Sequence, residues 1–163
     1  MILKIVSGGQ TGADRAALDA ALSFGFEIGG WVPKGRLAED GVIPQCYPNL
    51  RETDSKNLKI RTKHNVRDSD ATLIFSHGPL QGGSAYTRAK AIELDKPYWH
   101  LDLTETTVAE AVRHLRGWLE TIRPQVLNVA GPRASKDPQI YDKTRAILAL
   151  LLRDTKACGN NPL

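Results

Sequence analysis

The sequence predicts an α/β fold in which a mainly parallel β-sheet of about five or more strands is covered by helices on both faces. Short apolar runs alternate along the chain with longer segments of helical periodicity, a pattern typical of such a sheet. Glycine-bearing turns follow several of the short runs. The chain of 163 residues has the length of one domain. We therefore expect residues 1–163 to form a single ligand-binding domain.

The strands and helices follow from these patterns in chain order. Runs rich in β-branched or aromatic residues are predicted as buried strands: Leu3–Val6, Ile28–Val32, Ala71–Phe75, Tyr98–Leu103 and Val126–Val129. Stripes of apolar residues at helical spacing lie in the segments 17–22, 108–119 and 140–152. Thr107 and Glu110 have the spacing of a capping box, which marks the start of a helix. The elements together predict a Rossmann-like three-layer sandwich.

One long segment departs from this alternation. The chain from Lys34 to about Val66 is polar and rich in turn residues, and its residues from about 54 to 65 could form a helix that carries Arg61 and Lys63. A long irregular segment inside a compact domain is usually a functional loop or a disordered one. The mixed charges suit a loop folded over a ligand, and a solvated insertion is an equal alternative.

The most distinctive local motif is Ser7–Arg15, which reads SGGQTGADR between the first strand and the first helix. Glycines let backbone amides approach an anion closely, and a helix N-terminus adds partial positive charge. The motif has the form G-G-x-x-G without a lysine, so it matches neither the dinucleotide fingerprint nor the Walker motif. The alternative is structural: the glycines permit a tight turn, and Thr11 and Asp14 cap the helix.

Repetition of this feature favours ligand binding. Ser76–Ser84 and Ala130–Ser135 also lie between a predicted strand and a helix, and both contain glycines. The carboxyl ends of parallel strands meet at one edge of a sheet, where ligands bind. Backbone amides, hydroxyl groups and Arg133 at that edge predict an anion site.

Basic residues at the end of the second predicted strand distinguish between two classes of ligand. A fold that binds NAD places an acidic residue there for the ribose hydroxyls. This chain has Lys34 and Arg36 instead, which favour a phosphate and disfavour ordinary NAD binding.

Composition excludes several other classes of protein. A net charge of +4 favours anionic partners in general. The two cysteines, Cys46 and Cys158, have no metal or redox spacing, and His77 and His100 have no partner at ligand spacing, so we expect neither a disulfide framework nor a metal site. No run is long and apolar enough for a membrane span, and no signal peptide is recognisable. We expect a cytoplasmic protein.

The motifs together resemble a family known as the putative molybdenum carriers. The resemblance rests on residues 7–19, 30–36, 38–41, 61–62, 65–66, 68–70, 82–84 with Thr87, and 128–133. That family is similar to a broader Rossmann-like superfamily, which includes lysine-decarboxylase-like phosphoribohydrolases, DNA-processing proteins and the molybdenum cofactor carrier of algae. The resemblance implies a pocket for molybdenum cofactor or another phosphorylated, nucleotide-like ligand, with the phosphate at the glycine turns.

The same resemblance raises an enzymatic alternative. The phosphoribohydrolase branch uses a P-G-G-x-G-T-x-x-E pattern whose glutamate serves cleavage of an N-glycosidic bond. The corresponding turn here, Gln81–Thr87, keeps two glycines, but Lys90 stands three residues after Thr87 in place of the glutamate. This difference favours binding over hydrolysis by that mechanism.

Two functions follow as expectations. The first is a carrier or sensor without catalysis that binds a phosphate-bearing small molecule, with molybdenum cofactor as the candidate cargo. The alternative is a nucleotide-processing hydrolase that cleaves the N-glycosidic bond of a nucleoside monophosphate in the same pocket, with Asp14, Glu39 or Asp40 as the acid–base group. Mixed charges without a basic stripe make nucleic-acid binding a poor fit, and a homo-oligomer is expected by analogy. The predicted ligand-binding residues are Gly8, Gly9, Gln10, Thr11, Gly12, Arg15, Lys34, Arg36, Arg61, Gly82, Gly83, Ser84, Thr87, Gly131 and Arg133.

Overall fold

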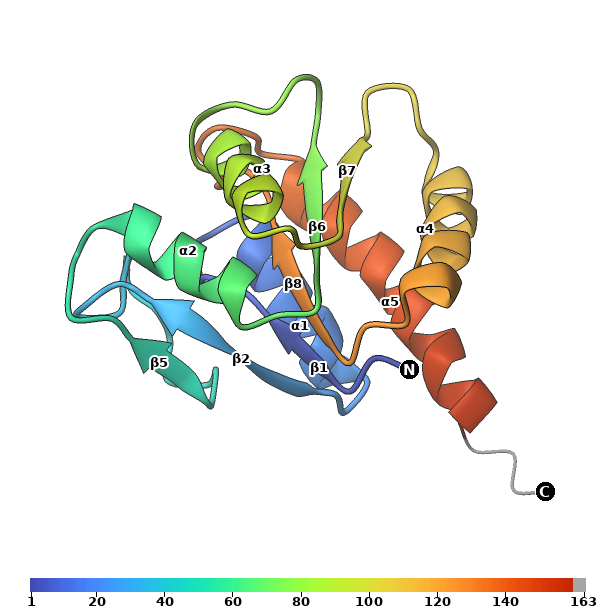
Figure 1. Cartoon of the computed structure of the whole chain (residues 1–163), viewed down its shortest axis with the longest axis horizontal. Coiled ribbons are helices and arrows are strands. Elements are labelled where there is room, and N and C mark those ends of the chain that lie inside the picture. Colours follow the sequence, from blue (N-terminus) through green and yellow to red (C-terminus); the bar gives the residue numbers. More distant parts are fainter. Residues whose placement is uncertain (160–163) are drawn as a thin grey trace.

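A parallel sheet forms the centre of the protein (Figure 1). The computed structural model describes residues 1–159, with the side chains of residues 1–155, and over this range the sheet has six strands in the order β5-β2-β1-β8-β6-β7. All neighbouring pairs are parallel. The strands are β1 (Lys4–Val6), β2 (Glu27–Val32), β5 (Leu50–Glu52), β6 (Ala71–Ser76), β7 (Tyr98–Asp102) and β8 (Val126–Ala130).

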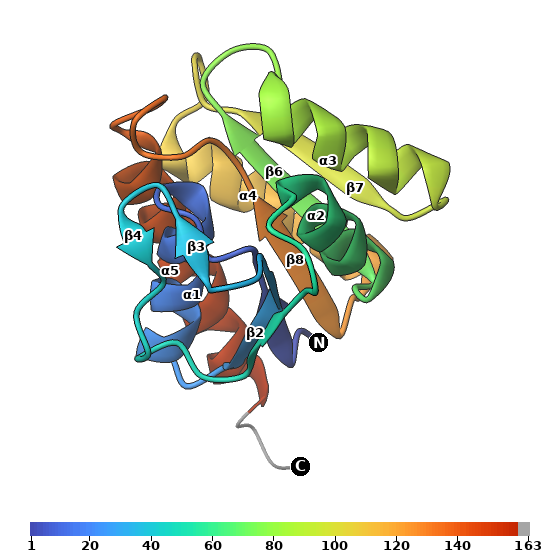
Figure 2. The same cartoon turned by 90° about the vertical axis from the view of Figure 1, so that its left-hand side faces the viewer.

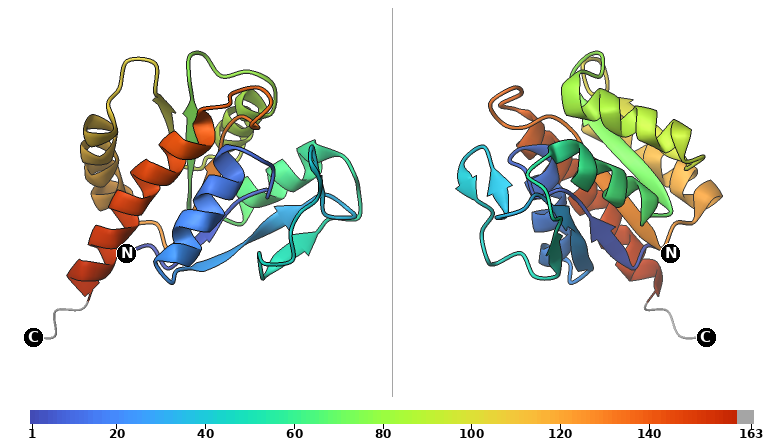
Figure 3. Two further views of the ribbon diagram at one scale, coloured as in Figure 1. Left: turned by 180° about the vertical axis from the view of Figure 1, so that it is seen from behind. Right: turned by 60° about the vertical axis from the view of Figure 1, so that its left-hand side comes forward.

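Helices cover both faces of the sheet and make the predicted three-layer sandwich. On one face, α2 (Leu58–Arg67) packs against α3 (Gly82–Glu93), and both are seen beside the sheet in Figure 2. On the other face, α5 (Ile140–Gly159) packs against α1 (Ala13–Ser23) and α4 (Val108–Ile122). The pair α1 and α5 comes forward in the rear view of Figure 3. The fold class predicted from the sequence is confirmed.

The core lies between the central strands and the two helical layers. All of β6 is buried, and Leu127 of the neighbouring β8 and Ile5 of β1 are fully buried as well. Each such side chain contributes about 1.5–3 kcal/mol by leaving water. Strands buried on both faces carry continuous apolar runs, which is why the sequence revealed these strands clearly.

The segment after β2 contains structure that the sequence pattern did not reveal. A short antiparallel pair, β3 (Leu37–Ala38) with β4 (Gly41–Val42), forms a hairpin, and β5 adds an edge strand beside β2. β5 has three residues and two of them are exposed, so it has no apolar periodicity to detect. The helix expected at residues 54–65 begins at Leu58, because the Asn57 side chain accepts a hydrogen bond from the Lys59 amide and caps α2 there.

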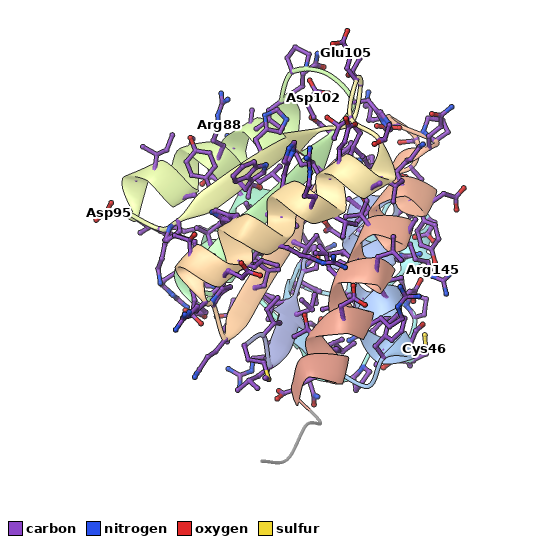
Figure 4. All side chains as sticks on the ribbon, turned by 90° about the vertical axis from the view of Figure 1, so that its right-hand side faces the viewer. Cys46, Arg88, Asp95, Asp102, Glu105 and Arg145 are labelled. Carbon is purple, nitrogen blue, oxygen red and sulfur yellow. The ribbon has the colours of Figure 1, made fainter. Side chains whose placement is uncertain are left out.

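No helix within residues 1–159 is long and apolar enough to cross a membrane. Cys46 is an exposed free thiol at the surface (Figure 4). The side chain of Cys158 lies outside the part of the chain that the structure describes.

Candidate functional site

The three glycine-bearing turns meet at one edge of the sheet. They follow β1, β6 and β8, which are neighbours in the sheet. A cavity of about 1300 Å³ opens beside the turns after β6 and β8, between them and α2. Of the predicted ligand-binding residues, Gln10, Arg61, Gly82, Gly83, Ser84, Thr87, Gly131 and Arg133 line this cavity, as does Asp14.

The first glycine turn is the most distinctive sequence motif, but protein atoms already fill the space beside it. A Cβ atom at Gly12 would lie 2.4 Å from the Pro132 carbonyl oxygen, and Gly12 has φ +78°. The amide of Ala13 donates to that same carbonyl, over 3.3 Å, and the Gln10 amide donates to Asp14, over 3.2 Å. These amides therefore stabilise the turn itself. Gly12 lets the turn after β8 approach it closely.

Hydrogen bonds from the β3–β4 hairpin hold the first glycine turn in place. The Glu39 carboxylate in the β3–β4 hairpin accepts hydrogen bonds from the Thr11 hydroxyl and from the Ser135 amide, the latter over 3.1 Å. Gln10 Oε1 accepts from the amides of Thr11 and Glu39. The hydrogen bonds from Ser135 and Thr11 hold the pKa of Glu39 below its usual value. The carboxylate thus ties the turns after β1 and β8 together.

Asp40 and Arg15 form a second contact between this hairpin and the segment that follows β1. The two side chains pair through two hydrogen bonds, one of them 2.7 Å long, and Arg15 also donates to the Gly9 carbonyl over 3.2 Å. The guanidinium of Arg15 holds the pKa of Asp40 below its usual value. Glu39, Asp40, Arg15 and Thr11 lie outside the cavity lining. The two carboxylates that sequence reasoning offered as acid–base groups thus have structural partners, because the hairpin directs them toward the turns.

Asp14 and Arg61, which both line the cavity, form an ion pair in which the carboxylate is buried. Arg61 Nη1 lies 3.2 Å from Asp14 Oδ2, and Asp14 is 3% exposed. Burial raises the pKa of Asp14 above that of a free carboxyl, and Arg61 opposes the rise. The guanidinium fills the space beside Gly8, since a Cβ there would lie 1.4 Å from Nη1. Arg61 Nε is buried without a hydrogen-bond partner among the described residues.

The second glycine turn is open. Gln81 caps α3 without a side-chain hydrogen bond, and a Cβ at Gly82 or Gly83 would meet no atom within 4 Å. Within the described residues, the amides of Gly82 and Gly83 donate to no protein group, while the Ser84 amide donates to the Gln81 carbonyl. The first turn of α3 therefore presents free amides and the positive end of a helix to the cavity.

Cationic side chains line the same cavity as this helix end. Lys59 and Arg61 reach the cavity from α2, and Arg133 and Lys136 reach it from the turn after β8. The acidic side chains in the lining, Asp14 and Asp137, already have partners in Arg61 and His77. The arrangement is suited to an anion held by amides and cations together.

Besides Arg15, two further predicted basic residues are not brought to the cavity. Arg36 donates to the carbonyls of Ile43 and Pro44, over 3.2 and 2.9 Å, and so fastens its own loop. Lys34 is exposed on the same loop, away from the lining. The chain turns back after β2 through Gly35 and Arg36, which both have positive φ, and this turn carries the two side chains away from the strand ends.

The structure also places residues at the cavity that sequence reasoning missed. His77 Nδ1 lies 2.7 Å from Asp137 Oδ2, and both residues line the cavity. Lys59, Lys136 and Tyr86 join them. His77 and Asp137 stand 60 positions apart, so no local spacing signals the pair.

The loop between β6 and α3 is fixed by β7. Asp102 accepts hydrogen bonds from the hydroxyl and amide of Thr104 and from the Gly78 amide, which lower the pKa of Asp102 to about 2. Figure 4 places Asp102 near Glu105 at the end of β7. Ser76 links the loop to β7 a second time. Its Oγ donates to the Gly78 carbonyl and lies 2.7 Å from His100 Nε2. The open helix end therefore follows an ordered loop.

Among the described residues, no group of three or more His, Cys, Asp or Glu side chains is placed to hold a metal ion.

A parallel sheet covered on both faces, with a cavity at the carboxyl ends of its strands, defines a Rossmann-like α/β protein. The model of the circularly permuted YpsA SLOG family, cpYpsA, matches residues 5–152, and the chain belongs to this family. It is also similar to a crystal structure named "Putative molybdenum carrier protein" from Syntrophus aciditrophicus SB, with 51% sequence identity and a TM-score of 0.90; the match covers 93% of this chain and 95% of that one. The comparison with curated proteins gives no match.

Proposed function

We propose that this protein binds a phosphate-bearing small molecule as a carrier or sensor and that the phosphate lies at the N-terminus of α3. The observation that carries the proposal is the open end of α3, where Gly82 and Gly83 present free amides toward a cavity with four cationic side chains. Amides at a helix N-terminus and nearby guanidinium or ammonium groups are what phosphate recognition requires.

Molybdenum cofactor is the candidate cargo. The similar protein from Syntrophus aciditrophicus is named as a molybdenum carrier. The organic part of molybdenum cofactor is a pterin that bears a phosphate, and a cavity of about 1300 Å³ has room for a ligand of that size. The phosphate would lie at Gly82 and Gly83, and the residues of the turn after β8 would face the remainder.

The arrangement of carboxylates supports binding rather than hydrolysis. Glu39 and Asp40 are held by Thr11, Ser135 and Arg15 outside the cavity lining. Asp14 lines the cavity but is paired with Arg61. An N-glycosidase of the phosphoribohydrolase kind would need a free carboxyl facing the ligand.

Replacing Gly83 with leucine is expected to abolish ligand stabilisation while leaving the fold intact. A side chain at this position enters open space at the helix end and displaces the phosphate. Wild-type protein with a ligand at 100 times its dissociation constant gains about 2.7 kcal/mol, which raises the Tm by about 5–10 °C. A thermal-shift screen with molybdopterin, nucleoside monophosphates, inorganic phosphate and molybdate measures this rise.

Gly117→Leu is the matched control for that experiment. Gly117 is also a helical glycine at which an added Cβ would meet no atom within 4 Å, but it lies in α4, away from the cavity. This variant should keep the full ligand-induced shift. The proposal fails if no probe stabilises the wild type, or if Gly83→Leu keeps the shift that the control shows.

A further inference from the structure

A histidine–carboxylate pair lies at the cavity beside the turn after β8. His77, just after β6, and Asp137, just before α5, pair through Nδ1 and Oδ2 at 2.7 Å. The side chains are 26% and 15% exposed, so the pair is largely shielded from solvent. Asp137 Oδ1 accepts in addition from the Gln139 amide over 3.2 Å, which fixes the carboxylate. The pair is therefore an ordered part of the cavity wall.

This pairing determines what the other ring nitrogen can do. An ionised carboxylate only accepts hydrogen bonds, so His77 Nδ1 must be the donor. In the neutral imidazole, Nε2 is then an acceptor. Within the described residues, the His77 ring makes its hydrogen bond through Nδ1 and none through Nε2. A ligand group that meets His77 must supply an N–H or O–H donor.

The cavity has a second anchoring point at His77, which also lines it. The free amides of Gly82 and Gly83 and the cations of α2 favour an anion, whereas an uncharged imidazole that donates through Nδ1 offers Nε2 as an acceptor. A cavity of about 1300 Å³ greatly exceeds the volume of one phosphate. The two anchoring points thus suit different chemical groups of one ligand.

We propose that His77, oriented by Asp137, forms a second subsite that binds an N–H or O–H donor of the ligand while the α3 N-terminus holds its phosphate. The inference rests on the proposed function, since it assigns the second half of the same ligand. The ligand class is then an organic phosphate whose heterocycle or sugar carries such a donor. Free oxyanions such as phosphate or molybdate use the first subsite alone and bind more weakly.

Calorimetric titration of the whole protein at pH 8 tests the subsite with three probes: inorganic phosphate, guanosine 5′-monophosphate and molybdopterin. At least one organic phosphate should bind the wild type tenfold or more tightly than inorganic phosphate does. His77→Ala should weaken that probe about 10- to 100-fold, the effect of losing one to two hydrogen bonds in a shielded site, and should leave the affinity for inorganic phosphate unchanged.

Two further variants separate positioning from folding. Asp137→Asn keeps an oxygen that can accept from the Gln139 amide but no longer fixes the imidazole tautomer, so it should weaken the organic probe by a smaller factor. His114→Ala, on α4 and outside the cavity lining, should bind every probe as the wild type does. Thermal unfolding of each variant without ligand verifies that the fold is kept.

The outcomes distinguish the two proposals. If no probe binds the wild type, the proposed function itself is wrong. The subsite is overturned, and phosphate binding stands, if organic phosphates bind no more tightly than inorganic phosphate, or if His77→Ala binds them as tightly as the wild type. Equal loss of organic and inorganic phosphate in His77→Ala would place His77 in the phosphate site and would also overturn a separate subsite.

Discussion

Replacing Arg61 with methionine is expected to lower the free energy of unfolding by about 3–5 kcal/mol at pH 7. The guanidinium is the cationic partner of Asp14, a carboxyl with only 3% of its surface exposed. Removing it leaves a buried charge without compensation, and the methionine cannot replace the hydrogen bond. Urea denaturation followed by circular dichroism measures the loss, and the same variant should bind the phosphate-bearing ligand weakly.

The pH dependence of this variant gives a sharper test. Burial already raises the pKa of Asp14 in the folded protein, and loss of Arg61 raises it further. A carboxyl with a raised folded-state pKa binds more protons when folded, so stability falls as pH rises from its unfolded pKa near 4 through its folded pKa. Arg61→Met should therefore recover stability relative to the wild type when the pH is lowered from 8 toward 5.

A double variant is the control for the buried charge. Asp14→Asn combined with Arg61→Met removes both charges, and the asparagine oxygen can still accept from the Gln10 amide. Replacing both members of a buried pair costs little, so the double variant should regain most of the lost stability and lose the extra pH dependence. A double variant as unstable as Arg61→Met would show that packing of the long side chain, not charge, explains the loss.

Alanine at Gly12 and alanine at Gly83 are expected to have opposite effects. Gly12 has φ +78°, and a Cβ there would lie 2.4 Å from a backbone oxygen of Pro132 and 2.9 Å from the amide nitrogen of Ala134. These backbone atoms cannot rotate away, so Gly12→Ala should cost about 3 kcal/mol or more, or prevent folding. Gly83 lies in open space at ordinary helical φ, and Gly83→Ala should raise stability by about 0.4–1 kcal/mol.

Urea denaturation of both variants, beside the wild type, measures the contrast. Equal and small effects at the two positions would contradict the view that the first turn is a packing element while the second is open. A large loss in Gly83→Ala would contradict it equally, because that glycine would then have a structural role.

The central part of the fold could be predicted from the sequence. β6 and β8 are rich in apolar residues because most of their residues are buried, and the capping box of Thr107 and Glu110 is present at the start of α4. The edge strand β5 could not be predicted, because two of its three residues face solvent and its pairing with β2 comes from tertiary contacts.

The candidate site could be predicted only in part. The sequence identified all three glycine turns, but local pattern does not distinguish a glycine that faces open space, such as Gly83, from one that accommodates a neighbouring backbone, such as Gly12. Arg36 was predicted near the ligand from its position after β2, and the structure instead pairs it with the carbonyls of its own loop. Contacts that join residues far apart in sequence, such as His77 with Asp137, are set by the topology and leave no local signal.

The most direct test of the central claim, that the anion site is the open end of α3, is a titration of ¹⁵N-labelled protein with inorganic phosphate followed by amide NMR. The amide signals of Gly82 and Gly83 should move most, because these amides are free to donate to the phosphate. The amides of Gln10 and Ala13, which already donate to Asp14 and Pro132, should move little. Large shifts at Gln10 and Ala13 with Gly82 and Gly83 unchanged would contradict the account and place the anion at the first turn.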